Sequence, residues 1–288
     1  AMVSTPSYDP NRLASHNTEQ QRRAWAEYTA ADPPVLRNRA ISETYPPGST
    51  FKLIDVAAAL QHGYTPQSPV TAASEITLTG TNTPLRNFAG TPCGTGATAT
   101  LQDALARSCN TAFAELVAAL GEDVLREQAA AFGIGSTDLA IPMRVTPSTL
   151  GDIPDTAALQ QSAIGQRDVR LTPLQNAMIV AAIANGGELL APYLIKEIQG
   201  PDLETIDTTQ PDRIGRAIPA NVARMITEMM IASENRTQGG GRITGVQIAS
   251  KTGTAEHGEN PDQTPPHNWY VAFAPAENPQ VAVAVLVE

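Results

Sequence analysis

The sequence predicts an α+β fold in which an antiparallel β-sheet is flanked by helices and a mostly helical subdomain is inserted into the chain. Three β-rich runs joined by short connections predict an antiparallel meander near the C-terminus: 246–254, 269–274 and 281–287. The middle of the chain has helical periodicity and lacks the alternating strands that a doubly wound parallel sheet requires. Because Ala1 to Ser4 also has the composition of a strand end, we expect both ends of the chain to contribute to the sheet.

Capping and breaking signals predict the elements of the first hundred residues. A polar surface helix is expected from Thr18 to Ala30. A second helix follows Pro46-Pro47-Gly48, begins at Ser49 and continues through an alanine-rich, apolar run to Gly63. From 63 to 96 the chain is rich in Thr, Pro, Gly and Asn, which predicts an irregular excursion with short strands at most.

Further helices are predicted along the rest of the chain. Thr100 with Asp103 resembles a capping box, and Thr172-Pro173-Leu174-Gln175 combines a cap, a proline at the first helical position and a glutamine at the third. The helix after Thr172 is apolar nearly all round, which predicts that it is buried. Prolines punctuate 141–154, which is predicted to be loop. The predicted helices span 100–106, 111–120, 123–132, 172–184 and 219–233.

Composition bounds the architecture and excludes some partners. With 288 residues, we expect one domain, 1–288, made of an α/β subdomain (about 1–62 and 167–288) and a helical subdomain (about 63–166). A net charge of −10 and a pI of about 4.9 argue against nucleic acid or an anionic membrane surface as a partner. No apolar run approaches the ~20 residues of a membrane span. Both ends look cut, so we expect an anchor or a further domain outside this sequence.

The cysteines and histidines predict neither a metal site nor a cofactor. Cys93 and Cys109 show no ligand spacing with the four histidines, and the histidines show none with one another. An even pair of cysteines is compatible with one disulfide in an oxidising compartment, and equally with two buried thiols. A disulfide would pin the irregular segment around Cys93 beside Cys109.

The turn around Ser49 carries the first candidate chemistry. Two prolines mark a boundary, and Gly48 lets the backbone bend sharply into the helix. Ser49 and Lys52 are three residues apart, so their side chains share one face of that helix. A hydroxyl at a helix N-terminus, one turn from an amine, is a candidate activated nucleophile. An N-cap serine beside a solvated lysine would give the same pattern.

Two later motifs complete the candidate site. Lys251-Thr252-Gly253-Thr254 ends the first late strand, where a cation, two hydroxyls and a glycine that permits close approach suit a bound carboxylate. The pattern Ser-x-Asn occurs three times, and only Ser108-Cys109-Asn110 lies between Ser49 and Lys251 with a helical subdomain around it. It falls at the break between two predicted helices, where its side chains can face a cleft.

With Ser49-x-x-Lys52, Ser108-x-Asn110 and Lys251-Thr252-Gly253 in this order, the chain resembles the penicillin-binding protein and serine β-lactamase superfamily. Other stretches resemble class B penicillin-binding proteins, especially the penicillin-binding protein A type of actinobacteria, monofunctional transpeptidases of cell division. The family also has an N-terminal anchor, a non-catalytic domain and a last helix over the sheet, which this sequence does not contain, so we expect either that the sequence is trimmed or that something else covers that face. The stretches that carry the finer resemblance, over essentially the whole chain, are 5–11, 38–40 with 45–49, 164–166 with 171–175, and 267–270.

The resemblance implies a peptidoglycan D,D-transpeptidase that cross-links stem peptides. It implies that Ser49 attacks the penultimate carbonyl of a D-Ala-D-Ala donor to form an acyl-enzyme, and that Lys52 takes the Ser49 proton. Lys52 must then be neutral, and burial with the like charge of Lys251 is expected to lower its pKa. Ser108 would relay a proton to the leaving amine. Asn110 would bind a backbone carbonyl of the donor and help to place Lys52.

The remaining site residues are expected to bind the end of the donor. The resemblance implies that Lys251, Thr252 and Thr254 hold the terminal carboxylate beside Gly253, and that the backbone N–H groups of Ser49 and Thr254 form the oxyanion hole. β-Lactams carry the same carboxylate and a strained amide, so they are expected to inhibit covalently. An amine acceptor and membrane proteins of cell division are the other expected partners. The expected location is the extracytoplasmic face of the bacterial membrane.

Three rival functions stay open. A serine β-lactamase needs a base for deacylation, and no Glu-x-x-x-Asn pattern occurs between Asn110 and Lys251. A non-catalytic β-lactam sensor domain would bind covalently without catalysis, and the class B stretches argue against it. A Ser-His-Asp hydrolase lacks its Gly-x-Ser-x-Gly elbow. His257 and His267 flank a loop near the candidate site and are expected to be solvated.

Overall fold

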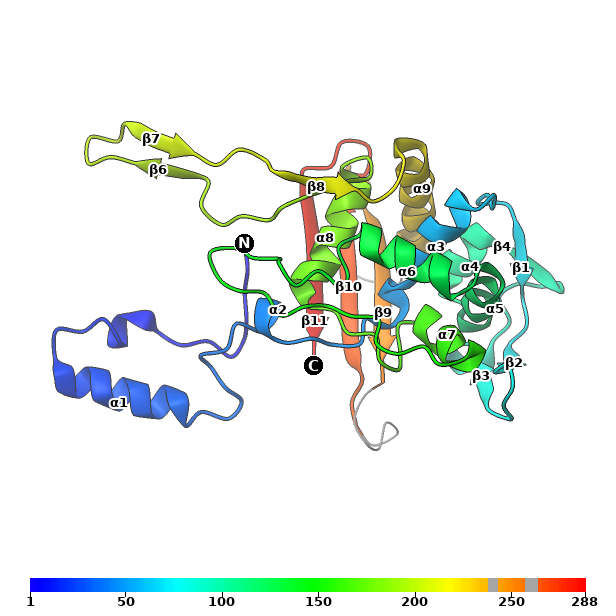
Figure 1. Ribbon diagram of the computed structural model, residues 1–288, viewed down its shortest axis with the longest axis horizontal. Helices are drawn as coiled ribbons and strands as arrows, with labels where there is room; N and C mark the ends of the chain where they lie inside the picture. Colours follow the sequence, from blue (N-terminus) through cyan, green and yellow to red (C-terminus); the bar gives the residue numbers. More distant parts are fainter. Residues whose placement is uncertain (238–242, 257–263) are drawn as a thin grey trace.

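The computed structural model describes residues 1–237, 243–256 and 264–288, and its centre is a three-stranded antiparallel sheet in the order β11-β10-β9 (Figure 1). Tyr270 of β10 lies opposite Thr252 of β9 and Val285 of β11. The predicted meander is therefore confirmed. The first strand starts three residues later than predicted, because a turn closed by the Val246 N–H precedes it. The strands are β9 (Ala249–Ala255), β10 (His267–Ala274) and β11 (Val281–Val287).

The two faces of this sheet have different environments. Helix α8 (Pro173–Ala184) packs on one face, where Val271 and Phe273 are buried in the core. Its cap is the predicted one, since the Thr172 hydroxyl accepts the N–H of Gln175, and the helix is largely buried. The opposite face carries an exposed row on β11: Val281, Val283, Val285 and Val287.

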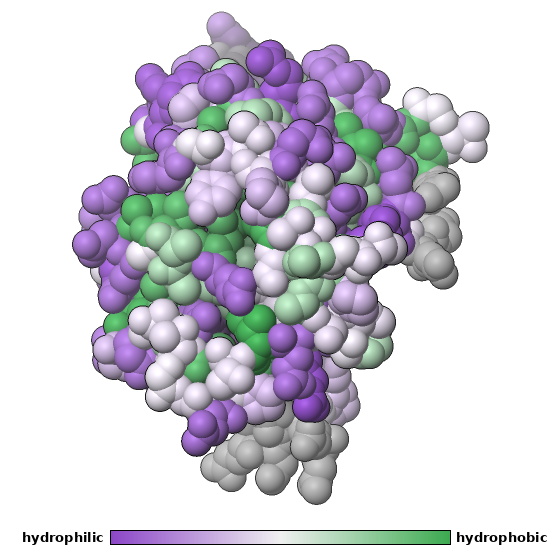
Figure 2. Space-filling view, turned by 90° about the vertical axis from the view of Figure 1, so that its right-hand side faces the viewer, coloured by the Kyte–Doolittle hydropathy of each residue, from purple (hydrophilic) through white to green (hydrophobic). Residues whose placement is uncertain are grey.

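Most helices lie on the β9 side of the sheet (Figure 1). One hydrophobic cluster runs through these helices and continues into α8 and β10, so the helical part and the sheet share a core. Seen from the helical side, hydrophilic side chains predominate along the rim, with apolar ones between them (Figure 2). Among the described residues, no helix has both the length and the apolar character that a membrane crossing requires. The helices are α3 (Lys52–Gln61), α4 (Leu101–Arg107), α5 (Asn110–Leu120), α6 (Glu122–Ala131), α7 (Thr156–Ala163) and α9 (Ala220–Arg236).

The prediction of a strand at the N-terminus is wrong, because residues 1–9 form none. Side-chain contacts hold this segment instead of a backbone ladder. The Ser4 hydroxyl donates to the Arg37 carbonyl and accepts the Arg39 N–H, while Met2 packs against a small apolar cluster. A 3₁₀ turn and a surface helix then extend away from the main body (Figure 1). These N-terminal elements are η1 (Pro10–Arg12), α1 (Thr18–Thr29) and α2 (Arg39–Ser42).

The predicted irregular excursion contains only short elements, as expected. They are β1 (Pro69–Thr71), β2 (Glu75–Thr77), β3 (Pro84–Arg86) and η3 (Phe88–Gly90), with β4 (Thr98–Thr100) paired to β1 just beyond them.

Two other strand pairs escape the sequence pattern, because their strands are short and largely exposed and so show no clear apolar alternation. One of them, β6–β7, is a hairpin that projects from the body (Figure 1). Helix α7 escapes too, since it is buried nearly all round. The two pairs are β5 (Glu188–Leu190) with β8 (Arg213–Arg216), and β6 (Glu197–Gln199) with β7 (Thr205–Thr208).

Candidate active site

The turn that carries Ser49 lies against the edge strand of the sheet. Residues Gly48–Thr50 form a 3₁₀ turn, η2, and α3 begins at Lys52, so the helix predicted from Ser49 starts as this turn. Two hydrogen bonds anchor the turn to distant parts of the chain. The Gly48 N–H donates to the Gly165 carbonyl (2.9 Å), and the Trp269 indole N–H donates to the Pro46 carbonyl (2.9 Å).

Glycines allow three backbone segments to touch at this turn. A Cβ atom on Gly253 would lie 2.8 Å from the Pro47 carbonyl oxygen, and one on Gly48 would lie 2.5 Å from the Thr254 carbonyl oxygen. On Gly165 it would lie 2.1 Å from the Gly48 carbonyl oxygen. Side chains at these positions would therefore push the Ser49 turn away from its neighbours. Since the N–H and C=O of one residue in an antiparallel strand point to the same edge, the Thr254 N–H also faces this turn.

Replacing Gly165 by alanine is expected to destabilise the protein far more than replacing Gly80. Both glycines have positive φ angles, +68° and +75°, so both substitutions incur a backbone cost of about 1 kcal/mol. Only at Gly165 must the Gly48 backbone also move, which adds about 2 kcal/mol of overpacking, whereas nothing lies within 4 Å of a Cβ at Gly80. Equal losses of unfolding free energy in denaturant titrations of the two variants would contradict this packing argument.

The Lys52 amine lies at the centre of the predicted residues and is fully buried. Its Nζ is 2.8 Å from the Ser108 carbonyl oxygen, 2.8 Å from Asn110 Oδ1 and 3.0 Å from Ser49 Oγ. The first two oxygens can only accept hydrogen bonds, and a neutral amine has two hydrogens to give them. Its lone pair is then left to accept the Ser49 proton. The geometry thus suits an unprotonated lysine that activates the serine hydroxyl.

Electrostatics favour the same protonation state. Burial, and then the like charge of Lys251, hold the pKa of the Lys52 amine well below its ordinary value, while Asp55 opposes the shift. Burial also lowers the pKa of Lys251, to about 7. Asp55, one turn after Lys52 on α3, is fully buried, and burial raises the pKa of its carboxyl well above the ordinary range. A carboxyl with a raised pKa carries less negative charge, so Asp55 does less to hold a proton on Lys52.

The Ser108 motif joins the two lysines. Ser108 ends α4 in the left-handed conformation (φ 59°), which turns its carbonyl toward Lys52. Its Oγ lies 2.9 Å from Lys251 Nζ and 3.5 Å from Lys52 Nζ. Asn110 binds Lys52 through its oxygen and donates from its nitrogen to the Arg86 carbonyl (2.9 Å). The structure therefore brings together the side chains of the three predicted motifs.

Cys93 and Cys109 are joined by a disulfide, with their Cα atoms 5.9 Å apart. The sequence is compatible with a disulfide or with two buried thiols, and the structure contains the disulfide. It ties the irregular segment that precedes β4 to the residue between Ser108 and Asn110. The covalent link therefore holds this irregular segment beside the Ser108 motif.

The last motif lies on β9 with its side chains on alternate faces. Lys251 and Gly253 are buried toward the Ser49 turn, and Lys251 Nζ donates to the Thr252 carbonyl (2.8 Å). Thr252 is half-buried and Thr254 is exposed, both on the opposite face. The strand thus offers a cation and two hydroxyls at one edge of the sheet, a set suited to a carboxylate.

Some residues that shape the site were not singled out by sequence reasoning. Asn176 on α8 donates to the Thr50 hydroxyl (3.0 Å), which in turn donates to the Pro47 carbonyl (2.9 Å). These bonds tie the Ser49 turn to the core helix. The available signal was a polar residue inside an apolar helical run, and Asp55 shows the same signal on α3.

The expectation of solvated histidines is wrong for His267. This residue is 8% exposed on β10, and its ring packs edge-on against Tyr45, with ring centroids 5.2 Å apart. The strand begins earlier than predicted and includes it. His257 lies outside the described residues. Within the part of the chain that the structure describes, no group of three or more His, Cys, Asp or Glu side chains could hold a metal ion.

Comparison with known proteins gives a consistent result. Residues 1–288 match the family model of the penicillin-binding protein transpeptidase domain. The chain is 56% identical over 288 residues to the peptidoglycan D,D-transpeptidase PbpA of Mycolicibacterium smegmatis and 54% identical to PbpA of Mycobacterium tuberculosis. It covers 59% of the length of each relative, while each match covers 100% of this chain.

Solved structures agree with the sequence relatives. The fold matches penicillin-binding protein A from M. tuberculosis as a ceftriaxone acyl-enzyme complex, with a TM-score of 0.97 at 55% identity. It matches the penicillin G acyl-enzyme complex with a TM-score of 0.95 at 54% identity. Both matches cover 100% of this chain and 65% of the other, so the chain spans less than two thirds of these proteins. The predicted fold class is confirmed, and the chain belongs to the penicillin-binding protein transpeptidase domain family.

Proposed function

We propose that this chain is the catalytic domain of a peptidoglycan D,D-transpeptidase that is acylated by β-lactams. The observation that carries the proposal is the position of the buried Lys52 amine, 3.0 Å from Ser49 Oγ with its hydrogens directed to two oxygens that only accept. The identity with relatives named peptidoglycan D,D-transpeptidase supports the reaction. The acyl-enzyme complexes of the M. tuberculosis protein support covalent chemistry with β-lactams.

Acylation begins when the Ser49 hydroxyl attacks the penultimate carbonyl of the D-Ala-D-Ala donor. The new bond joins Ser49 Oγ to that carbon, and the hydroxyl proton passes to the lone pair of Lys52. The backbone N–H groups of Ser49 and Thr254 stabilise the oxyanion, a contribution of ~3 kcal/mol per donor. When the amide bond breaks, the leaving D-alanine amine takes a proton through Ser108, which lies between the two lysines. An acceptor amine then attacks the ester and releases Ser49.

The donor is held at both sides of the reacting bond. Lys251, Thr252 and Thr254 bind its terminal carboxylate, which approaches β9 beside Gly253. The bound carboxylate restores the charge of Lys251 by raising its pKa, and that charge in turn keeps Lys52 neutral. Asn110 has two amide hydrogens, of which one is directed to the Arg86 carbonyl, and the other can bind a backbone carbonyl of the donor.

The lifetime of the penicillin adduct, measured by intact-mass spectrometry, tests the proposed function. A transpeptidase is expected to gain one benzylpenicillin on Ser49 within minutes and to keep it for hours. It should also release D-alanine from a D-Ala-D-Ala stem peptide when an amine acceptor is present. Loss of the adduct within seconds would instead indicate a β-lactamase. A stable adduct without any D-alanine release from the peptide would indicate a sensor domain.

We further propose that the longer protein is anchored in the bacterial membrane, works at its extracytoplasmic face and associates with membrane proteins of cell division. The disulfide between Cys93 and Cys109 supports an oxidising compartment, and the resemblance to division transpeptidases supports the partners. Release of the full-length protein from membranes by a salt wash would contradict the anchor. A full-length protein that never accumulates at division sites would contradict the division partners.

The subdomain boundaries at about 62/63 and 166/167 stay a prediction. They receive support from the site, since Ser49, Lys52 and Lys251 come from one proposed subdomain and Ser108 and Asn110 from the other. Because both share one core, they should be coupled rather than independent. Hydrogen exchange in which 63–166 does not open as a unit would argue against this division.

A further inference from the structure

A carboxylate outside the three motifs, that of Glu234, connects helix α9 to strands β9 and β10. Glu234 lies in the last turn of α9, and its Oε2 accepts hydrogen bonds from the Ser250 hydroxyl on β9 and from the Tyr270 hydroxyl on β10 (3.0 Å). Ser250 is fully buried. Burial, and in part Glu234 itself, raises the pKa of the Tyr270 phenol, so that this group stays a donor. The proposed mechanism uses none of these three side chains.

This cluster borders Thr252 on two sides. Ser250, Thr252 and Thr254 share one face of β9, because successive side chains of a strand alternate. Tyr270 is the residue directly opposite Thr252 on β10, where paired side chains lie about 5 Å apart on the same face. Ser250 therefore precedes Thr252 along the face and Tyr270 flanks it across the ladder. Glu234 binds both of these neighbours through one oxygen.

Strand β9 needs such a support because it is the edge of the described sheet. It pairs with β10 on one side, while its other edge faces the Ser49 turn. Hydrogen bonds to a carboxylate are stronger and more directional than those between neutral groups. Helix α9 packs against both β9 and α4, whose C-cap is Ser108, so α9 can hold β9 and the Ser108 motif in a fixed relation.

We propose that Glu234 is a positioning residue that fixes the face of β9 presenting Thr252 and Thr254, and thereby sets the affinity of the site for ligands with a carboxylate. This inference rests on the proposed function. Glu234 touches no reacting atom, and it acts through Ser250 and Tyr270. Its loss should therefore weaken recognition of the carboxylate and leave the reactivity of Ser49 in place.

The test compares acylation by benzylpenicillin with acylation by its methyl ester, which lacks the free carboxylate. In Glu234→Ala, we expect the second-order rate constant for benzylpenicillin to fall about tenfold, with less than a twofold change for the ester. Tyr270→Phe and Ser250→Ala should each produce part of this loss and should be non-additive with Glu234→Ala. Glu234→Gln keeps an oxygen acceptor and should restore most of the rate. If Glu234→Ala does not fold, the same comparison can be made with Tyr270→Phe and Ser250→Ala, each of which removes one hydrogen-bond donor to Glu234.

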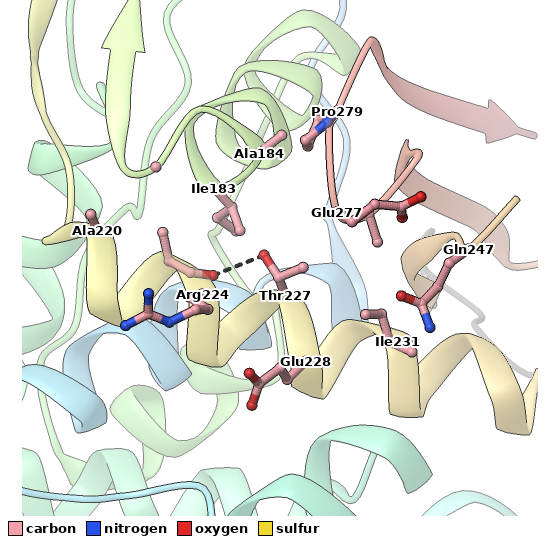
Figure 3. Close-up of a pocket in the computed structure, with 13 residues that line it drawn as sticks. Ile183, Ala184, Ala220, Arg224, Thr227, Glu228, Ile231, Gln247, Glu277 and Pro279 are labelled. Carbon is pink, nitrogen blue, oxygen red and sulfur yellow. Dashed lines mark hydrogen bonds between the residues drawn. The ribbon is translucent and has the colours of Figure 1, made fainter.

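A matched control lies on the same helix. Glu228 is an exposed carboxylate of α9 at a pocket of about 360 Å³ between α8, α9 and the turn after β10 (Figure 3). Glu228→Gln removes the same charge without touching β9, and it should leave both rate constants unchanged.

Three results would overturn the inference. If neither rate constant changes in Glu234→Ala, Glu234 does not position the carboxylate-binding face. An equal fall of both rate constants would indicate general damage to the fold. Faster acylation by benzylpenicillin in Glu234→Ala, with the rate constant for the ester unchanged, would mean that Glu234 only repels the ligand carboxylate. Failure of the proposed function is distinguishable, because it shows in the wild-type protein itself, as an adduct lost within seconds or as no release of D-alanine from the stem peptide.

Discussion

Replacing Ser49 by alanine is expected to abolish covalent labelling by benzylpenicillin. The attacking oxygen is lost, and removal of a nucleophile of this kind lowers a rate by about 10⁶-fold. The fold should persist, because among the described residues the hydroxyl has a hydrogen bond with Lys52 alone, and such a bond contributes about 1 kcal/mol. Intact-mass spectrometry after overnight incubation should therefore show the unmodified mass, while thermal unfolding stays close to that of the wild type.

The control for this experiment is Ser15→Ala. Ser15 is a half-buried serine of another Ser-x-Asn sequence, outside the three motifs, and its variant should be labelled fully. An adduct that persists on a folded Ser49→Ala protein would refute the nucleophile assignment. Peptide mapping would then identify the residue that carries the adduct.

Replacing Lys52 by arginine or methionine is expected to lower the acylation rate constant by about a thousandfold. A guanidinium cannot give up its proton at accessible pH, so an arginine at this position could not accept one from Ser49. Arginine is also larger than the fully buried site of Lys52 allows. Methionine avoids this overpacking and removes the amine, so the two variants share only the loss of the base. Stopped-flow or quenched mass measurements with benzylpenicillin give the rate constants.

The sequence has three lysines, and the one outside the motifs provides the matched control. Lys196 is exposed just before β6, and Lys196→Arg should acylate at the wild-type rate. Acylation of Lys52→Met within a few-fold of the wild-type rate would show that Ser49 does not depend on this amine.

Local sequence signals predicted the parts of the fold that local chemistry determines. The cap at Thr172 and the apolar run after it specify a buried helix without any distant partner. The three β-rich runs specify a meander because short connections leave few other arrangements. The prediction of an N-terminal strand was wrong because it depended on contacts with distant parts of the chain. Composition suggested a strand, but the side chains of Ser4 and Met2 hold this segment, and residues 1–9 form no strand.

The sequence predicted which residues belong to the candidate site, but it did not predict how they contact one another. The order of the three motifs identified Ser49, Ser108 and Lys251, yet sequence spacing could not place the Ser108 carbonyl on Lys52, which depends on a left-handed residue at a helix end. Nor could it reveal Glu234. That contact depends on the register of β9 with β10 and on the packing of α9, and both are set by tertiary structure.

The central claim is that Lys52 is neutral at physiological pH, and the pH dependence of the acylation rate constant at saturating benzylpenicillin tests it most directly. A base must be unprotonated, so the rate rises with pH through the pKa of Lys52 and then levels off. Because burial and Lys251 lower that pKa, the rate constant should already be near its plateau at pH 7 and change little up to about pH 9.5. A rate constant that climbs about tenfold per pH unit over this range would reveal an amine with the ordinary lysine pKa of about 10.4, and would contradict the account.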